Sequence, residues 1–228
     1  MNIKVFQIYF DDSQKVKLNP RCIPYLNDNL TPLFENQVIL DLQPQIEGSD
    51  YFGVLSHKFE QKNEINIPFE LIEKGEYDIY CIGKNSIFNH NVLQFSTDTH
   101  GSKWRFLFFS MVSEVLFNND STLTLAVLEY INKGIYQNAV ICKSDIYNLY
   151  IESTLKPCSE WLENNTSLKS LLYSKCDYNG NLTPEQLISK FGVPHYTFHT
   201  FLLERLWSLF LQANKLNDIS VYYSTDFR

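Results

Sequence analysis

The sequence of 228 residues contains none of the short signatures that mark the common nucleotide-binding and hydrolytic enzymes. GxGxxG, GxxxxGK followed by Ser or Thr, GxSxG and HExxH are all missing. In their families these patterns supply a dinucleotide turn, a phosphate loop, a nucleophilic serine and a pair of zinc ligands. The standard dinucleotide-binding, P-loop, serine-hydrolase and zinc-protease classes therefore have no support in this sequence.

Cysteine is sparse, and its spacing excludes two further kinds of site. The cysteines are odd in number, scattered, and show no CxxC pair. Neither a zinc site nor a disulfide framework is indicated, so a reducing cytoplasm is the expected location. The five are Cys22, Cys81, Cys142, Cys158 and Cys176.

Runs of positive charge and long apolar segments are missing as well. The net charge is −7 and no stretch is rich in Lys or Arg, so nucleic acid is a disfavoured partner. No apolar segment reaches the roughly 18 residues that cross a bilayer, so no transmembrane segment is expected. The apolar start lacks a small-residue cleavage site and is followed by two acids, which favours a first strand over a signal peptide.

The residues that are present suffice for a sizeable core. Hydrophobic residues make up 44% of the chain and aromatic residues 15%, which excludes global disorder. The length favours one domain, and no repeat, low-complexity segment or linker divides the chain. We therefore predict a single domain over residues 1–228.

Short runs rich in Val, Ile, Tyr and Phe dominate the first half and predict strands. Their nearly continuous apolar character favours burial on both faces, as in parallel sheets. The expected strands are Lys4–Phe10, Gln37–Leu42, Tyr51–His57 and Tyr77–Gly83.

The second half reads mostly as amphipathic helices. The clearest signal is a helix with Thr183 as N-cap, Pro184 at its first position, Gln186 completing a capping box and Gly192 after its end. Pro157 should end or kink an earlier helix. The other expected helices cover residues 101–117, 121–134, 144–155 and 200–215, with strands at 138–143 and 220–224.

These elements predict an α/β fold. Its central sheet should be mainly parallel, lie in the N-terminal half and be flanked by helices, and the C-terminal half should be rich in helices.

Asp98 and His100 are the first candidate site, because they follow an apolar run that we read as extended. A carboxylate and an imidazole two residues apart on an extended chain point the same way and suit a divalent cation such as Mn²⁺ or Mg²⁺. Gly101 and Ser102 would then present free N–H groups to an anion at a helix start. The alternative is that Asp98 or Thr99 only caps the next helix.

His57 and Lys58 form the second candidate, at the end of a predicted buried strand. Ligands of open α/β sheets bind beyond the carboxyl ends of the strands, so Lys58 suits a phosphate and His57 a phosphate or a sugar hydroxyl. Asp78 and the pair Asp11-Asp12 lie beside strands and suit a ribose hydroxyl or a metal. The alternative for all of them is a solvated polar turn.

Glu204 is the third candidate, in the apolar segment "FLLERLWSLF". A buried carboxylate is costly unless it is paired or functional, and the adjacent Arg205 should point to another face of the helix. Glu204 is therefore either an acid/base in a pocket or a residue of the solvent-facing side.

Three segments carry a resemblance to a known family: "QIYFDD" with "NPRCIPYLN", "DYFGVLSHKFEQKN", and "YTFHTFLLERLWSLFL". They resemble small glycosyltransferase-like proteins of bacterial capsule and O-antigen gene clusters and of phages, which are similar to nucleotide-sugar enzymes with the GT-A type fold. "EYDIYCIG" and "DTHGS" are similar to further segments of that family, although "DTHGS" lacks the proline of its His-Pro-Gly.

The resemblance implies transfer of a sugar from a nucleotide-diphosphate donor to a hydroxyl of a saccharide or another acceptor, with Mn²⁺ or Mg²⁺ as the candidate cofactor. Lys58, His57 and Asp78 would bind the nucleotide sugar, and Glu204 would be the catalytic base. Asp98 and His100 would replace the metal-binding Asp-Xaa-Asp of GT-A enzymes, with a histidine in place of the second acid.

Two other functions stay open at this point. An α/β binding or interaction protein without catalysis would show an exposed apolar patch and bind no nucleotide. A phage enzyme that glycosylates DNA bases would need a basic groove, against which the net charge of −7 weighs.

Overall fold

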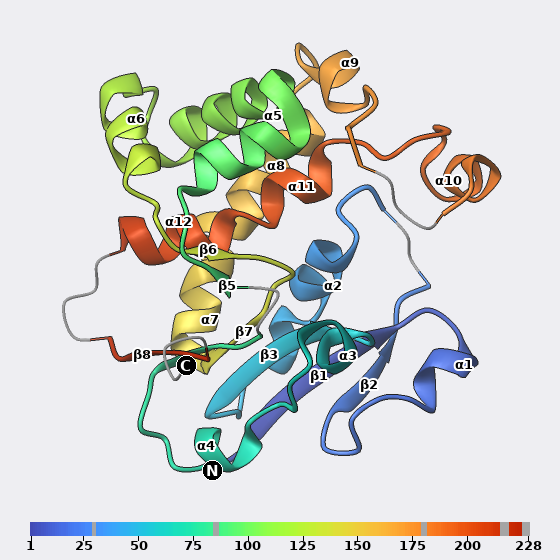
Figure 1. Ribbon diagram of the computed structural model, residues 1–228, viewed down its shortest axis with the longest axis vertical. Helices are drawn as coiled ribbons and strands as arrows, with labels where there is room; N and C mark the ends of the chain where they lie inside the picture. Colours follow the sequence, from blue (N-terminus) through green and yellow to red (C-terminus); the bar gives the residue numbers. More distant parts are fainter. Residues whose placement is uncertain (29–30, 84–86, 179–181, 215–218, 225–228) are drawn as a thin grey trace.

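The computed structural model describes residues 1–28, 31–83, 87–178, 182–214 and 219–224, and its centre is a six-stranded sheet (Figure 1). The order of the strands is β2-β1-β3-β7-β4-β8. Their bounds are Ile3–Tyr9 for β1, Ile23–Leu26 for β2, Tyr51–Ser56 for β3, Ile79–Cys81 for β4, Val140–Lys143 for β7 and Val221–Tyr223 for β8.

Three of the strand pairs are parallel, as the prediction of a mainly parallel sheet requires. β1 is parallel to β2 and β3, and β4 is parallel to β8. β7 runs antiparallel between β3 and β4. Gly53 of β3 lies opposite Ile141 of β7, and a Cβ at position 53 would come within 2.7 Å of the Ile141 side chain. A small second sheet pairs β5 (Ile87–Phe88) with β6 (Gly134–Ile135).

The sheet is buried on both faces, which is why its strands read as continuous apolar runs. Successive side chains of a strand point to opposite faces, and β1 shows this directly. Val5 packs in a cluster with helices α3 (Phe59–Asn63) and α4 (Phe69–Ile72), whereas Phe6 packs in a larger cluster with the helices of the C-terminal half.

The helices confirm the predicted α/β class and the helix-rich C-terminal half. In Figure 1 most of them gather on one side of the sheet. No helix in the described ranges is long and apolar enough to cross a bilayer. Besides α3 and α4, they are α1 (Asp12–Lys15), α2 (Glu35–Asp41), α5 (Val92–Leu116), α6 (Ser121–Glu129), α7 (Ser144–Tyr150), α8 (Lys156–Asn164), α9 (Lys169–Leu172), α10 (Pro184–Phe191), α11 (His199–Leu203) and α12 (Leu206–Ala213).

The predicted strand Gln37–Leu42 is wrong, because this segment lies in and just after helix α2. Its buried residues Val38, Ile39 and Leu42 recur at helical spacing and join the large core cluster. A short apolar run fits either element, and here packing against β3 decides for the helix. The sequence also gave no sign of β2, which is a short and mostly exposed edge strand.

The extended run expected before Gly101 is wrong as well. Residues 92–100 already belong to α5, which begins at Asn91 as N-cap and is broken only at Gly101. The φ of Gly101 is 83° and its ψ is 177°, a backbone conformation open to glycine alone. The prediction of a helix that starts at this glycine therefore holds for the second half of α5.

Two predictions about helix ends have opposite outcomes. The capping box of Thr183 and Gln186 is present as predicted, and Gly192 follows α10 in the left-handed conformation. Pro157, by contrast, does not end its helix. A π-helical turn over Ile151–Leu155 leads directly into α8, and the proline is the second residue of α8, so the irregularity of the helix lies in the π-turn just before it.

Candidate functional site

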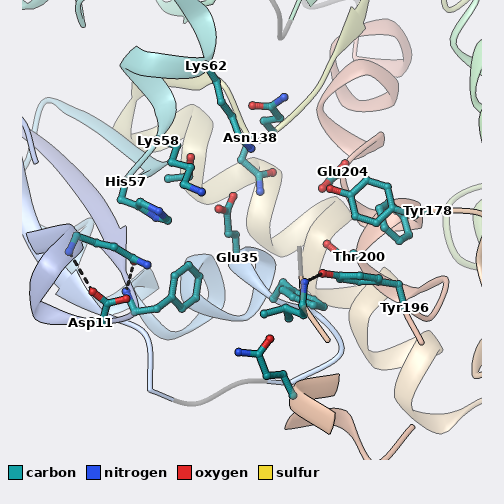
Figure 2. A pocket seen from close by; sticks show the side chains of 18 residues that line it. Asp11, Glu35, His57, Lys58, Lys62, Asn138, Tyr178, Tyr196, Thr200 and Glu204 are labelled. Carbon is teal, nitrogen blue, oxygen red and sulfur yellow. Dashed lines mark hydrogen bonds between the residues drawn. The ribbon is translucent and has the colours of Figure 1, made fainter. Parts of the chain in front are cut away.

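A cavity of about 580 Å³ opens where the parallel strands β1 and β3 end, and we take it as the candidate active site (Figure 2). The carboxyl edge of a parallel sheet is the usual place for a ligand in α/β proteins. Charged, polar and aromatic side chains line the cavity: Phe10, Asp11, Gln14, Phe34, Glu35, Ser56, His57, Lys58, Lys62, Gln137, Asn138, Tyr178, Leu182, Gln186, Tyr196, Thr200, Phe201 and Glu204.

The N-terminal half supplies one wall of the cavity. Asp11 follows β1 and caps α1 by accepting a hydrogen bond from the Gln14 amide at 3.1 Å. His57 and Lys58 follow β3, and Lys62 comes from the short helix α3 behind them. Glu35 is the first residue of α2 and points into the same space (Figure 2).

The C-terminal half supplies the opposite wall. Glu204 directly follows α11, and Tyr196 precedes that helix. The Tyr196 ring stacks on Phe34 with centroids 6.2 Å apart, so that an aromatic pair joins the two walls. The Tyr196 hydroxyl also accepts a hydrogen bond from the amide of Leu182 at 3.2 Å. The cavity therefore exists only once the two halves have packed together.

The surroundings of Glu35 shift the pKa of its carboxyl group far from the ordinary value. The residue is reached through the cavity, but its carboxyl is enclosed by protein, and this burial raises the pKa of Glu35 to about 7. Lys62 lowers the pKa and Glu204 raises it, which places both of these side chains within electrostatic reach. Glu35 is thus half ionised near neutral pH, as a general base should be.

His57 is held in the neutral state on the other side of the cavity. Burial lowers the pKa of its imidazole, and the positive charges of Lys58 and Lys62 lower it further. The edge of the ring meets Phe10 at a centroid distance of 5.8 Å. The positive charge of this wall therefore resides on the two lysines, which can meet an anion without competition from a charged imidazole.

Glu204 is anchored from behind by a buried cation. Arg205 is 4% exposed, and its Nη1 donates to Glu204 Oε2 at 3.0 Å. The same guanidinium donates from Nε to Ser96 Oγ at 2.9 Å and lies 4.3 Å from the ring centre of Tyr136. The expectation that Arg205 points away from Glu204 is wrong, because the chain leaves α11 at Glu204 and bends before α12, so the two side chains are not successive positions of one helix.

Of the residues that the sequence singles out, the cavity brings together Asp11, His57, Lys58 and Glu204. Asp78 is not among them. It lies before β4, accepts a hydrogen bond from the Ser220 amide at 2.7 Å and pairs with Lys143 at 2.6 Å. Its contacts thus join β4, β7 and β8, and neither Ser220 nor Lys143 lines the cavity.

Asp98 and His100 also lie outside the cavity, and their geometry does not fit a metal-binding pair. In a helix, residues two apart point to different faces, so Asp98 is exposed and bonds to Gln94, whereas His100 is 4% exposed. The ring nitrogens of His100 face Arg205 at 3.2 Å and the Cys176 sulfur at 3.6 Å. Among the described residues, no group of three or more His, Cys, Asp or Glu side chains is arranged to hold a metal ion.

The sequence analysis missed several residues of the cavity, among them Glu35, Lys62 and Asn138. Glu35 was overlooked because the segment after it was read as a strand. Asn138 was read as the first residue of the predicted strand 138–143, whereas the structure places it in the turn ahead of β7. All five cysteines are free and buried, in keeping with the absence of a disulfide pattern.

The comparisons with known proteins are consistent with this architecture. No protein-family model matches the chain, and no curated protein matches it. The chain is similar to the apo structure of the bifunctional glycosyltransferase WbbM, with a TM-score of 0.53 and 13% sequence identity. The similarity covers 98% of this chain and 44% of the WbbM chain, so the present chain spans less than half of that protein. The chain therefore has a glycosyltransferase-like α/β fold.

Proposed function

We propose that this protein is a glycosyltransferase that uses a nucleotide-diphosphate sugar as its donor. One observation carries the proposal, namely that a cavity with two lysines and two facing carboxylates lies at the carboxyl ends of β1 and β3 in a glycosyltransferase-like fold. WbbM is a glycosyltransferase, but at this identity only its fold is informative, so the chemistry proposed here rests on the residues of the cavity.

The donor's diphosphate suits the wall that carries Lys58 and Lys62. When the glycosidic bond to the diphosphate breaks, negative charge grows on the leaving oxygen, and nearby cations stabilise that charge. The Asp98–His100 metal site stays a prediction from the sequence and has no part in this scheme. The thermal-shift experiment with and without Mn²⁺ tests whether a divalent cation is required.

The acceptor hydroxyl suits the side of the cavity that carries Glu35 and Glu204. For a transfer with inversion, the acceptor oxygen bonds to the anomeric carbon, the bond to the diphosphate breaks, and a carboxylate takes the hydroxyl proton. Glu35 is the stronger candidate for this base because its pKa of about 7 matches neutral conditions. Glu204, the choice made from the sequence, would then hold the acceptor in place from its anchor on Arg205.

The test is a thermal-shift screen with UDP, GDP, CMP and dTDP, each with and without Mn²⁺. A ligand at about 100 times its dissociation constant stabilises the folded state by roughly 2.7 kcal/mol, so one nucleotide should raise the melting temperature by a few degrees. Lys58→Ala should weaken that shift. Lys103→Ala, on an exposed position of α5 outside the cavity, is the matched control and should leave it unchanged.

Absence of any shift at saturating nucleotide would favour the alternative of a non-catalytic binding protein. A shift that appears only with Mn²⁺ would establish metal dependence, and Asp98→Ala would then show whether the pair chosen from the sequence is involved.

A further inference from the structure

The turn that precedes β7 has an uncommon backbone. Gln137 and Asn138 both have positive φ, 59° and 50°, and the amide of Ala139 donates to the carbonyl of Tyr136 at 3.2 Å. Two successive central residues with positive φ are the mark of a type I′ turn. Asparagine adopts this conformation more readily than most residues, but glycine is the residue that adopts it without strain. The turn therefore has Gln137 and Asn138 at two positions whose backbone conformation alone would favour glycine.

Both polar atoms of the Asn138 side chain lie buried without a partner. The residue is 2% exposed, and neither Nδ2 nor Oδ1 has a hydrogen-bond partner within the part of the chain that the structure describes. The side-chain oxygen of Gln137 is likewise buried and unpaired there. Buried polar groups in folded proteins nearly always have partners, so an amide with two unpaired atoms in a cavity wall calls for a ligand.

The position of Asn138 indicates which part of a ligand it would meet. Figure 2 shows the side chain in the cavity between Lys62 on one side and Glu35 and Glu204 on the other. The carboxylate of Asp11 lies farther from Asn138 in the same view. Asn138 thus adjoins the groups to which we assign the leaving phosphate and the acceptor, and the transferred sugar would lie between those two.

The chemistry of the amide agrees with a sugar rather than a phosphate. A carboxamide presents one donor face and one acceptor face with no charge. A phosphate only accepts hydrogen bonds and would leave Oδ1 unpaired, whereas a sugar hydroxyl both donates and accepts. Two neighbouring hydroxyls can satisfy both atoms of Asn138 together, and a third can donate to Gln137.

We infer that Asn138 binds hydroxyl groups of the transferred sugar and so determines which donor sugar the cavity accepts. The inference rests on the proposed function, since it assigns the sugar end of the same cavity. A site built to bond a hydroxyl rejects analogues that lack it, because the buried amide is then left unpaired. Asn138 is therefore a specificity-determining residue.

The test compares nucleoside diphosphates with the matching nucleotide sugars by titration calorimetry. The ligands are UDP, GDP and dTDP and their glucose, galactose and mannose conjugates. The variant is Asn138→Gly, which removes the amide and relieves the positive φ. Asn118→Gly is the matched control, because Asn118 also has positive φ (49°) but lies exposed and outside the cavity.

For the wild type, at least one nucleotide sugar should bind more tightly than its free nucleotide. Asn138→Gly should lose about tenfold in affinity for that nucleotide sugar and less than about threefold for the nucleotide, whereas Asn118→Gly should match the wild type. Equal affinities of wild type and Asn138→Gly for the nucleotide sugar would overturn the inference. An equal loss for both ligands would overturn it too, since Asn138 would then contact the nucleotide.

Failure of the proposed function would be visible in the wild type alone, which would bind no nucleotide and no nucleotide sugar. If Asn138→Gly does not fold, Asn138→Asp takes its place, because it keeps the shape of the side chain and replaces the donor NH₂ group by a charged acceptor oxygen. An unchanged preference among the sugars in Asn138→Asp would count against the inference.

Discussion

Arg205 donates a hydrogen bond from Nη2 to Nε2 of His100, over 3.2 Å. A guanidinium cannot accept, so Nε2 must be the unprotonated nitrogen and the ring proton resides on Nδ1, which faces the Cys176 sulfur at 3.6 Å. Burial and the adjacent Arg205 charge lower the pKa of His100 to about 4. The histidine chosen from the sequence as a metal ligand thus supports the arginine that anchors Glu204.

Acidification should therefore destabilise the fold through His100. Its pKa is about 4 in the folded chain and 6.5 ordinarily, so between these values the unfolded chain binds more protons. The stability due to the neutral ring is fully present above pH 6.5 and is lost as the pH falls toward 4. His100→Gln still offers an acceptor to Arg205 but has no imidazole to protonate. Between pH 7.5 and pH 5 its free energy of unfolding, measured in urea, should therefore fall by about 2 kcal/mol less than that of the wild type.

His199 titrates in the same direction, since burial lowers its pKa to about 4 as well. His100→Gln should consequently reduce the pH dependence and leave part of it. A pH dependence identical to that of the wild type would show that His100 is protonated as readily in the folded chain as in the unfolded one.

Glu35 should have the opposite effect on stability and a direct effect on rate. Its pKa is raised from 4.5 to about 7, so its protonated form stabilises the fold below pH 4.5 and this stability is lost as the pH rises through 7. Glu35→Gln should therefore be more stable than the wild type at pH 8, by about 3 kcal/mol, and equally stable at pH 4. The unfolding midpoint in urea at the two pH values measures this difference.

If Glu35 is also the base, kcat/KM of the wild type should rise with pH through about 7, and Glu35→Gln should lose 100-fold or more in kcat, on the order expected for a general base. A variant that is more stable and still fully active would remove Glu35 from the mechanism and return the role to Glu204.

Asp78→Ala should weaken the sheet without affecting ligand binding. The carboxylate holds Lys143 at 2.6 Å and the Ser220 amide at 2.7 Å, and its loss should cost about 1–2 kcal/mol of stability. Asp98→Ala, at an exposed position, should change stability by less than about 0.5 kcal/mol. Nucleotide binding by a folded Asp78→Ala variant, measured by calorimetry, should equal that of the wild type. A loss of binding would support the ribose contact expected from the sequence.

Gly101→Ala should destabilise the fold more than the same change at Gly192. Gly101 has φ 83° and ψ 177°, where a side chain costs about 1–3 kcal/mol, whereas Gly192 has φ 74° and ψ 3°, where the cost is about 1 kcal/mol. No atom crowds a Cβ at either position, so the backbone alone causes the difference. Equal unfolding midpoints for the two variants would contradict this explanation.

Local sequence was sufficient to predict an element where the residues that define it lie within one short segment. The strands around Val5 and Val54 were predicted correctly because side chains buried on both faces leave an apolar run. The capping box of Thr183 and Gln186 was predicted because its hydrogen bonds lie within four residues. His57 and Lys58 were found because the end of a buried strand marks the ligand edge of an α/β sheet.

Only the tertiary structure decided what depends on residues far apart in the chain. Val38 and Ile39 could face the core from a strand or from a helix, and packing against β3 selected the helix. The same choice brought Glu35 to the cavity opposite Glu204. For His100, the helix turned the ring inward to Arg205, 105 positions later, and away from Asp98. Composition and periodicity thus determined the class of fold, whereas the contact between the two halves determined which polar side chains share the cavity.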